Sequence, residues 1–286
     1  MKVAIIGSNG QLGSDLLETF TRHRHKVAGL THAEIDVDQI VSVRTVLGEI
    51  RPEVVLNTAA FHNVPKCEED PARAFSVNSI GALNVAQVCD ELRSANVYFS
   101  TDYVFDGKKK SPYKESDLPN PLNIYAGTKL LGEYNTLNYC SRGYVIRISG
   151  IYGRVPCRAK GGNFITTMLR LAREKPEVKV VTDEILTPTP TSEIASKSLQ
   201  IFNSGAYGLY HLTCEGGCSW YEFARVIFDT LSLETPLLPA TVADFPSSVK
   251  RPFYSILEND QYKKLDLPSM PHWKDALISF LDRNIK

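Results

Sequence analysis

Several features that would point to a membrane, a nucleic acid or a secreted protein are absent from the 286-residue sequence. No run of apolar residues reaches the roughly 18 that a bilayer-spanning helix needs. Thirty-two basic and 32 acidic residues cancel, so no excess charge attracts nucleic acid or anionic lipid. The six cysteines lack the spacing of a disulfide framework, which favours reduced thiols in a reducing compartment. We therefore expect neither a membrane nor a nucleic acid as a partner.

The chain opens on a short apolar segment, residues 2–6 (KVAII), typical of a strand buried on both faces. This start leaves no room for a signal peptide, so we expect a cytoplasmic protein. Gly7, Gly10 and Gly13 follow directly and precede a segment with apolar residues on one face. Strand, Gly-x-x-Gly-x-x-Gly, helix predicts a turn that binds the pyrophosphate of a dinucleotide at a helix N-terminus.

The end of the second predicted strand, residues 26–30, bears on the choice of cofactor. NAD-dependent Rossmann proteins place an acidic residue there to bind the ribose, but Glu34 and Asp36 come only later in this chain. Without that carboxylate nothing repels a 2′-phosphate, and His32 is placed to face one. The sequence therefore favours NADPH, with NADH as the alternative.

A possible proton-transfer group combines Thr101, Tyr125 and Lys129. Tyr125 and Lys129 are four residues apart on a predicted helix, which places them about 6 Å apart along one face. A nearby ammonium group should lower the phenol pKa from roughly 10 and so permit proton exchange. Thr101 follows an apolar strand, residues 97–99, and supplies a hydroxyl for a substrate oxygen. The pattern predicts proton transfer to or from a carbonyl or an alcohol.

Alternating strands and helices predict an α/β fold with a Rossmann-type doubly wound parallel sheet, whose active site lies at the carboxyl ends of the strands. Residues 1–150 would form the NAD(P)-binding domain. Residues 151–286 would form mainly a smaller substrate-binding portion, with one or two elements returning to the sheet. We also expect one long helix over residues 71–94, a loop over 154–162 and a loop over 236–251.

Taken together, these motifs make the sequence resemble the dTDP-4-dehydrorhamnose reductase family of the extended short-chain dehydrogenase/reductase superfamily. The resemblance covers nearly the whole chain. It is carried by IIGSNGQLG (5–13), RPEVVLNTAA (51–60), STDYVFDG (100–107), PLNIYAGTKLLGE (121–133), GGNFITTMLRLA (161–172), GLYHLT (208–213), SWYEFA (219–224) and KRPFYS (250–255).

The resemblance implies NADPH-dependent reduction of the C4 ketone of a nucleotide-linked 4-keto-6-deoxy sugar, with dTDP-4-dehydro-L-rhamnose as the first candidate. Tyr125 would protonate the alkoxide, Lys129 would hold the nicotinamide ribose, and Thr101 would orient the carbonyl. The implied cofactor site consists of Gly7, Asn9, Gly10, Gln11, Leu12, Gly13, His32, Asp36, Val37, Ala59, Ala60, Tyr125 and Lys129. The implied substrate site consists of Thr101, Asp102, Tyr103, Asn163 and Arg251.

Two of these residues have structural alternatives: Asn163 is also a candidate helix N-cap, and Arg251 a surface charge. His211, Cys214 and Cys218 have the spacing of zinc ligands but lack a fourth ligand nearby, so no metal site is predicted.

The sequence departs from the family pattern around the predicted sugar pocket. His62 and Pro65 replace a Thr and an Asp, and Gly150 replaces a Trp that would form an apolar wall. Three alternatives therefore stay open: a reductase of a different 4-keto-6-deoxy sugar nucleotide, a sugar-nucleotide epimerase or dehydratase, and a non-catalytic NADP-binding regulatory subunit like the methionine adenosyltransferase β subunit. A homodimer is a further hypothesis.

Overall fold

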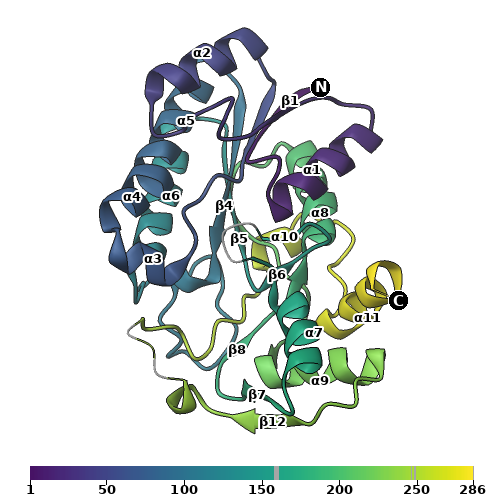
Figure 1. Cartoon of the computed structure of the whole chain (residues 1–286). Coiled ribbons are helices and arrows are strands. Elements are labelled where there is room, and N and C mark those ends of the chain that lie inside the picture. The colour runs from purple at the N-terminus through teal and green to yellow at the C-terminus, as the bar shows by residue number, and fades with distance from the viewer. Residues whose placement is uncertain (158–160, 246, 248, 286) are drawn as a thin grey trace.

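The structure, a computed structural model, describes residues 1–157, 161–245, 247 and 249–285. Its centre is a six-stranded parallel sheet with the strand order β10-β5-β4-β3-β1-β2 (Figure 1). The strands are β1 (Lys2–Ile6), β2 (Lys26–Leu30), β3 (Val54–Asn57), β4 (Ala95–Thr101), β5 (Gly143–Ile148) and β10 (Gly208–His211). The order reverses direction at β1, which confirms the doubly wound Rossmann-type sheet.

Helices cover both faces of this sheet. Alternate residues of β1 enter two separate cores: Val3 and Ile5 pack in one cluster, Ala4 and Ile6 in the other. The first core includes residues of α1 (Gln11–Arg22), α7 (Phe164–Glu174), α8 (Thr191–Ser204), α9 (Trp220–Leu231) and α11 (Trp273–Asn284). The second includes residues of α2 (Ile40–Ile50) and α5 (Gly81–Glu91), beside which α6 (Ile124–Tyr139) lies (Figure 1). A strand buried on both faces needs the continuous apolar run that the sequence shows.

The long helix predicted over residues 71–94 is confirmed as a continuous helical segment over residues 71–91, but its middle turn is not α-helical. The chain forms α4 (Pro71–Phe75), a π-helical turn (Ser76–Ile80) and α5, preceded by the short α3 (Val64–Glu69). The wide turn carries Asn78, fully buried, whose amide bonds the backbone of Phe61 and the hydroxyl of Thr128. These tertiary hydrogen bonds offset the poorer geometry of the π turn, and an apolar periodicity does not reveal them.

The C-terminal half returns β10 to the sheet edge, as expected, and builds a smaller portion beside it. That portion contains the strand pairs β6 (Ile151–Tyr152) with β9 (Thr189–Pro190), β7 (Val178–Val181) with β12 (Leu237–Ala240), and β8 (Ile185–Leu186) with β11 (Cys218–Ser219), together with α10 (Asp260–Lys263). The predicted loop over 236–251 is therefore wrong in its first part. Residues 158–160, 246 and 248 of the two predicted loops lie outside the described residues. The boundary at residue 150 stays a prediction.

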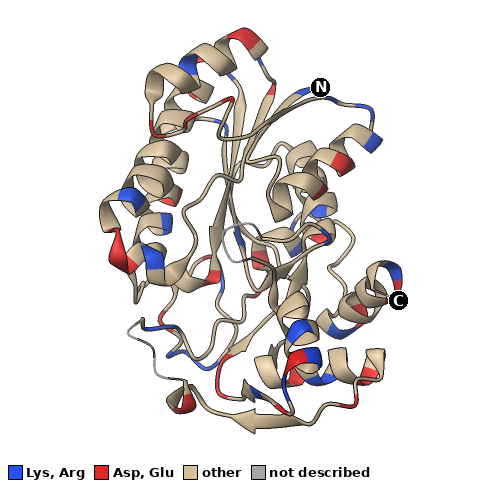
Figure 2. Ribbon diagram, in the orientation of Figure 1, with Lys and Arg blue, Asp and Glu red and all other residues tan. Residues whose placement is uncertain are grey.

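Acidic and basic residues are interspersed along the outer helices (Figure 2), and their totals are equal. None of the helices in the described part of the chain has the length and apolar character that crossing a membrane requires.

Two glycines of α6 give a matched test of the packing. A Cβ at Gly132 would lie 2.6 Å from the Asn78 carbonyl oxygen and collide with the Tyr98 hydroxyl, whereas a Cβ at Gly127 would meet nothing within 4 Å. We expect Gly132→Ala to lower the free energy of unfolding by about 1–3 kcal/mol through overpacking. Gly127→Ala should raise it by up to about 1 kcal/mol through helix propensity. Urea unfolding of both variants checks this, and equal effects would contradict the observed packing.

Candidate active site

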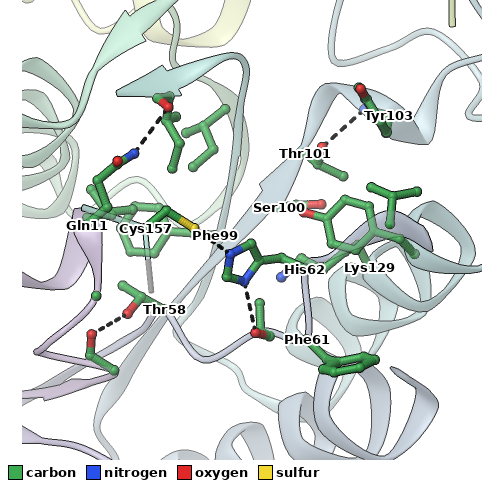
Figure 3. A pocket seen from close by; sticks show the side chains of 18 of the residues that line it. Gln11, Thr58, Phe61, His62, Phe99, Ser100, Thr101, Tyr103, Lys129 and Cys157 are labelled. Atoms are coloured by element: carbon green, nitrogen blue, oxygen red, sulfur yellow. Dashed lines mark hydrogen bonds between the residues drawn. The ribbon is translucent and has the colours of Figure 1, made fainter. Parts of the chain in front are cut away.

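A cavity of about 720 Å³ runs along the carboxyl ends of the parallel strands, from the glycine turn to the C-terminal portion. Residues from both halves of the chain line it, among them the glycine turn, Tyr125, Lys129 and Trp220. Figure 3 shows part of its wall, with Gln11 and Cys157 on one side of His62 and Lys129, Ser100 and Thr101 on the other. The sheet therefore brings the predicted cofactor and catalytic residues to one site.

The glycine turn has the geometry of an anion site. Gly7 has a φ of +81°, and its N–H bonds the Leu30 carbonyl at the end of β2. A Cβ at Gly13 would collide with the Gly7 carbonyl, so only glycine lets α1 approach β1 this closely. Gly10 caps α1 without a side-chain hydrogen bond, and the first turn of the helix holds no acidic residue. Its free N–H groups can thus receive a pyrophosphate.

The far end of the cofactor region lies after β2. His32, Asp36 and Val37 line the cavity there, and the His32 ring lies 3.9 Å from the Asp36 carboxylate. Sequence reasoning missed Arg73 of α4, which lines the same cavity and pairs with Asp38 at 2.8 Å. Arg73 thus brings a guanidinium, a group suited to phosphate oxygens, to the end of the cavity where His32 also lies. No local motif marks Arg73, since only the fold brings α4 to this end.

The loop after β3 forms the next part of the wall. Ala59 and Ala60 line the cavity as predicted, and Thr58 binds the β1 end through its hydroxyl, 2.7 Å from the Ile6 oxygen. The His62 ring reaches the Ala60 oxygen at 3.2 Å with Nδ1 and the Cys157 sulfur at 3.1 Å with Nε2 (Figure 3). This contact joins the loop after β3 to the loop after β6. Pro65 starts α3, where a missing N–H costs nothing.

The three predicted catalytic residues meet in the cavity. Thr101 ends β4, and its hydroxyl lies near enough to the Tyr125 phenol to influence the pKa of that phenol. Tyr125 lies in the first turn of α6, which the Asn123 side chain caps with a 2.9 Å bond from the Ala126 N–H. Lys129, 2% exposed, places its Nζ 3.9 Å from the centre of the Tyr98 ring. The helical spacing of the pair and the strand end of Thr101 are as the sequence predicts.

The protonation of this group differs from the prediction. Burial raises the pKa of Tyr125 above its ordinary value, opposed by the Thr101 hydrogen bond, so the expected lowering by Lys129 is wrong. Burial lowers the pKa of Lys129 to about 7, opposed by the charge of Glu133. The reason is shared: removal from water penalises the charged form of each group. A neutral phenol is the form that can donate a proton, which suits a reduction.

Asp102 and Tyr103, predicted to bind substrate, both line the cavity. The Asp102 carboxylate accepts hydrogen bonds from the hydroxyls of Thr101 at 3.1 Å, Ser149 at 2.8 Å and Ser255 at 2.6 Å. Its oxygens are thus engaged by the protein, and it orients Thr101. The Tyr103 ring lies edge-on to Tyr125 with the ring centres 6.3 Å apart.

Asn163 and Arg251 are placed differently. Asn163 caps α7 through its Oδ1, and its amide donates to the side-chain oxygen of Gln11 at 3.3 Å, so it is an N-cap that also lines the cavity. Arg251 is exposed and does not itself line the cavity, but its charge acts on Tyr103 and Glu184, which do.

Other residues of the substrate side were missed by sequence reasoning. Phe164 stacks on Trp220 with ring centres 4.5 Å apart, and Trp220 lies near enough to Glu184 to lower the pKa of that carboxyl, which burial raises. All three line the cavity, and they come from separate segments with no shared motif. At Gly150, a Cβ would lie 2.8 Å from Leu186, so Leu186 occupies space that a larger residue would need.

The possible zinc ligands do not form a metal site. Within the described residues no three His, Cys, Asp or Glu side chains are grouped to hold a metal ion. The His211 ring instead contacts Arg147 at 3.3 Å and the carbonyls of Tyr113 and Glu258.

The Cys157 thiol can report whether a ligand occupies the cavity, because it is partly exposed while the other five cysteines are buried. We expect iodoacetamide to alkylate Cys157 alone and saturating NADPH, the predicted cofactor, to slow this reaction at least about tenfold by covering the thiol. Mass spectrometry of tryptic peptides measures the rate, and Cys157→Ser is the control. An unchanged rate would place the cofactor elsewhere.

Comparison with known proteins agrees with this geometry. The family model for the RmlD substrate binding domain matches residues 1–285. The spore coat polysaccharide biosynthesis protein SpsK of Bacillus subtilis is 36% identical over 280 residues, covering 98% of this chain and 96% of that protein. The dTDP-4-dehydrorhamnose reductase of Aggregatibacter actinomycetemcomitans is 35% identical over 289 residues, covering 96% and 97%.

The structural comparison extends to a cofactor complex. The crystal structure of dTDP-4-dehydrorhamnose reductase from Bacillus anthracis in complex with NADP superposes with a TM-score of 0.94 at 34% identity, covering 99% of this chain and 100% of that one. These matches span the whole cavity-forming chain rather than its nucleotide-binding half alone. The chain therefore belongs to the dTDP-4-dehydrorhamnose reductase family of oxidoreductases.

Proposed function

We propose that the chain reduces the C4 ketone of a dTDP-linked 4-keto-6-deoxy sugar with NADPH, and that dTDP-4-dehydro-L-rhamnose, giving dTDP-L-rhamnose, is its substrate. The observation that carries the proposal is that one cavity holds Tyr125, Thr101 and a dinucleotide-type glycine turn. Burial raises the pKa of Tyr125, which suits it to donate a proton. Membership of the family supports the reaction class, and the NADP complex of the Bacillus anthracis relative supports the cofactor.

The residues of the cavity divide the work of a carbonyl reduction. NADPH, when bound, would supply the hydride. In the substrate complex, Thr101 would turn its hydroxyl proton from Asp102, to which it donates in the structure, to the ketone oxygen and so orient it. Tyr125 would then donate its phenolic proton to that oxygen as negative charge develops, since burial keeps the phenol protonated until a stronger base forms. Lys129, in its protonated form, would stabilise the phenolate that remains.

The substrate side favours a sugar nucleotide over a small ketone. Phe164 and Trp220 provide an aromatic wall, and the Arg251 charge lies close enough to act on cavity residues. An aromatic face and an Arg fork are suited to a base and to phosphate oxygens respectively.

Two features of the cavity wall favour a second candidate. Leu186 lies where a residue larger than Gly150 would stand, and the His62 ring contacts Cys157; Gly150 and His62 are positions where the sequence departs from the family pattern. Another 4-keto-6-deoxy sugar nucleotide is therefore the alternative substrate. A purely regulatory role is less favoured, because Thr101, Tyr125 and Lys129 are all present and assembled.

The test is NADPH oxidation by the purified protein with dTDP-4-dehydro-L-rhamnose generated in situ. Product formation should match the NADPH consumed, which an epimerase or dehydratase would not show. We expect Tyr125→Phe to lower kcat by at least about 100-fold, because the proton donor is lost while the ring is kept. Activity on other keto sugar nucleotides alone would select the second candidate, and full activity of Tyr125→Phe would contradict the proposed proton donor.

The preference for NADPH is tested at Arg73 and His32. We expect Arg73→Met combined with His32→Ala to weaken NADPH binding at least about tenfold and to leave NADH binding within about twofold, because only NADPH carries the 2′-phosphate. Fluorescence titration measures both dissociation constants. Lys66→Met, which removes an exposed charge from the neighbouring α3, is the control. An equal loss of affinity for NADPH and NADH would show that these residues shape the site without binding the 2′-phosphate.

A further inference from the structure

A network of buried polar side chains lies beneath the catalytic residues. Its members are Ser100 of β4, Glu133 of α6, Arg147 of β5 and His211 of β10, each at most 3% exposed. It therefore connects three neighbouring strands to the helix that carries Tyr125 and Lys129. The reaction described above uses none of these four side chains directly.

Glu133 is the centre of the network. Arg147 binds it with both arms, Nε to Oε1 at 2.9 Å and Nη2 to Oε2 at 2.6 Å. The Ser100 hydroxyl donates to the same Oε1 at 2.5 Å. A bidentate pair with a third bond leaves the carboxylate little freedom of position.

His211 completes the network as a neutral group. Its Nδ1 lies 3.1 Å from the Tyr113 oxygen and 3.0 Å from the Glu258 oxygen, so Nδ1 carries the proton. Nε2 is then free to accept from Arg147 Nη1 at 3.3 Å. Burial and the charge of Arg147 lower the pKa of His211 to about 3, so it adds no charge. The network thus holds one negative and one positive charge.

The network is connected to both halves of the catalytic group through neighbouring positions of the chain. Ser100 directly precedes Thr101, and Glu133 follows Lys129 by four residues, one helical turn along the same face. The bond between Ser100 and Glu133 therefore ties the strand that carries Thr101 to the helix that carries Tyr125 and Lys129.

The charged and titratable groups around Lys129 come from several elements. Lys129 itself faces the Tyr98 ring of β4 and the charge of Glu133 of α6. Asp102 and Cys67 of α3 act on Tyr125, and Arg147 of β5 binds Glu133, while the π turn Ser76–Ile80 contributes no titratable group. Glu133 is the group whose charge favours the ammonium form of Lys129.

We propose that Glu133 is a positioning residue: fixed by Arg147 and Ser100 one helical turn from Lys129, it aligns the Tyr125–Lys129 pair with Thr101 and places a negative charge near the Lys129 amino group. Its kinetic readout depends on the reductase activity proposed above. Its cofactor-binding readout does not depend on the identity of the sugar.

The test must distinguish this positioning role from a contribution of Glu133 to folding stability alone. Glu133→Gln alone would leave Arg147 buried without a counter-charge, which is strongly destabilising. We therefore choose the double variant Glu133→Gln/Arg147→Met, because neutral groups of similar size often replace a buried ion pair without loss of stability. Ser100→Ala breaks the link between strand and helix and changes no charge. The exposed pair Arg44–Glu91, changed to Met and Gln, is the matched control.

The readouts are kcat against pH and the NADPH dissociation constant against pH. Lys129 is charged below its pKa of about 7, so activity should be full at lower pH and fall above it. In the double variant we expect the midpoint of this fall to move about one unit lower, a tenfold loss of kcat at pH 8. The midpoint for NADPH binding should move in parallel. Ser100→Ala should lower kcat about tenfold at every pH with the midpoint unchanged, and the control should match the wild type.

The proposal is overturned if the folded double variant keeps the wild-type midpoint in both readouts. If the double variant does not fold, Ser100→Ala decides: an unchanged kcat overturns the alignment, and a loss at constant midpoint supports it. If the wild type reduces no keto sugar nucleotide, the proposed function fails. In that case both variants are judged by NADPH binding alone. The double variant should lower the pH midpoint of NADPH binding, and Ser100→Ala should weaken NADPH binding equally at every pH.

Discussion

A parallel sheet covered by helices on both faces leaves only the ends of its strands open for binding. This constraint organises the whole protein. Residues of β1 alternate between two apolar cores, so neither face can hold a ligand. The carboxyl ends of β1, β3, β4 and β5 meet instead at one cavity. The glycine turn lies there because it directly follows β1, and Thr101 lies there because it ends β4. The helix α6 brings Tyr125 beside them.

The second determinant is the removal of water from this cavity. Desolvation keeps the Tyr125 phenol protonated and weakens the hold of Lys129 on its proton. Around them the protein engages its own polar groups: Asp102 accepts from three hydroxyls, and Glu133 is bound by Arg147 and Ser100. The catalytic side chains therefore rest on groups whose hydrogen bonds are already satisfied, which is the arrangement that a preorganised site requires.

Much of the fold could be predicted from the sequence, because apolar runs and helix caps are local signals. The strands Lys2–Ile6 and Lys26–Leu30 have the bounds expected from their patterns. The failures have tertiary causes. The π turn Ser76–Ile80 is stabilised by hydrogen bonds from Asn78 to a distant loop and helix. The strand β12 forms because its backbone pairs with β7. Neither partner is visible in the local sequence.

By itself the sequence determined the glycine turn, the pair Tyr125–Lys129 and the strand end at Thr101, since each depends on residues a few positions apart. Only the tertiary structure decided which charges surround them. Arg73, Glu184 and Trp220 reach the cavity from separate segments, and His211 reaches Arg147 across 64 positions of the chain. The pKa of Tyr125 depends on the same assembly, because burial is a property of the packed protein and not of any motif.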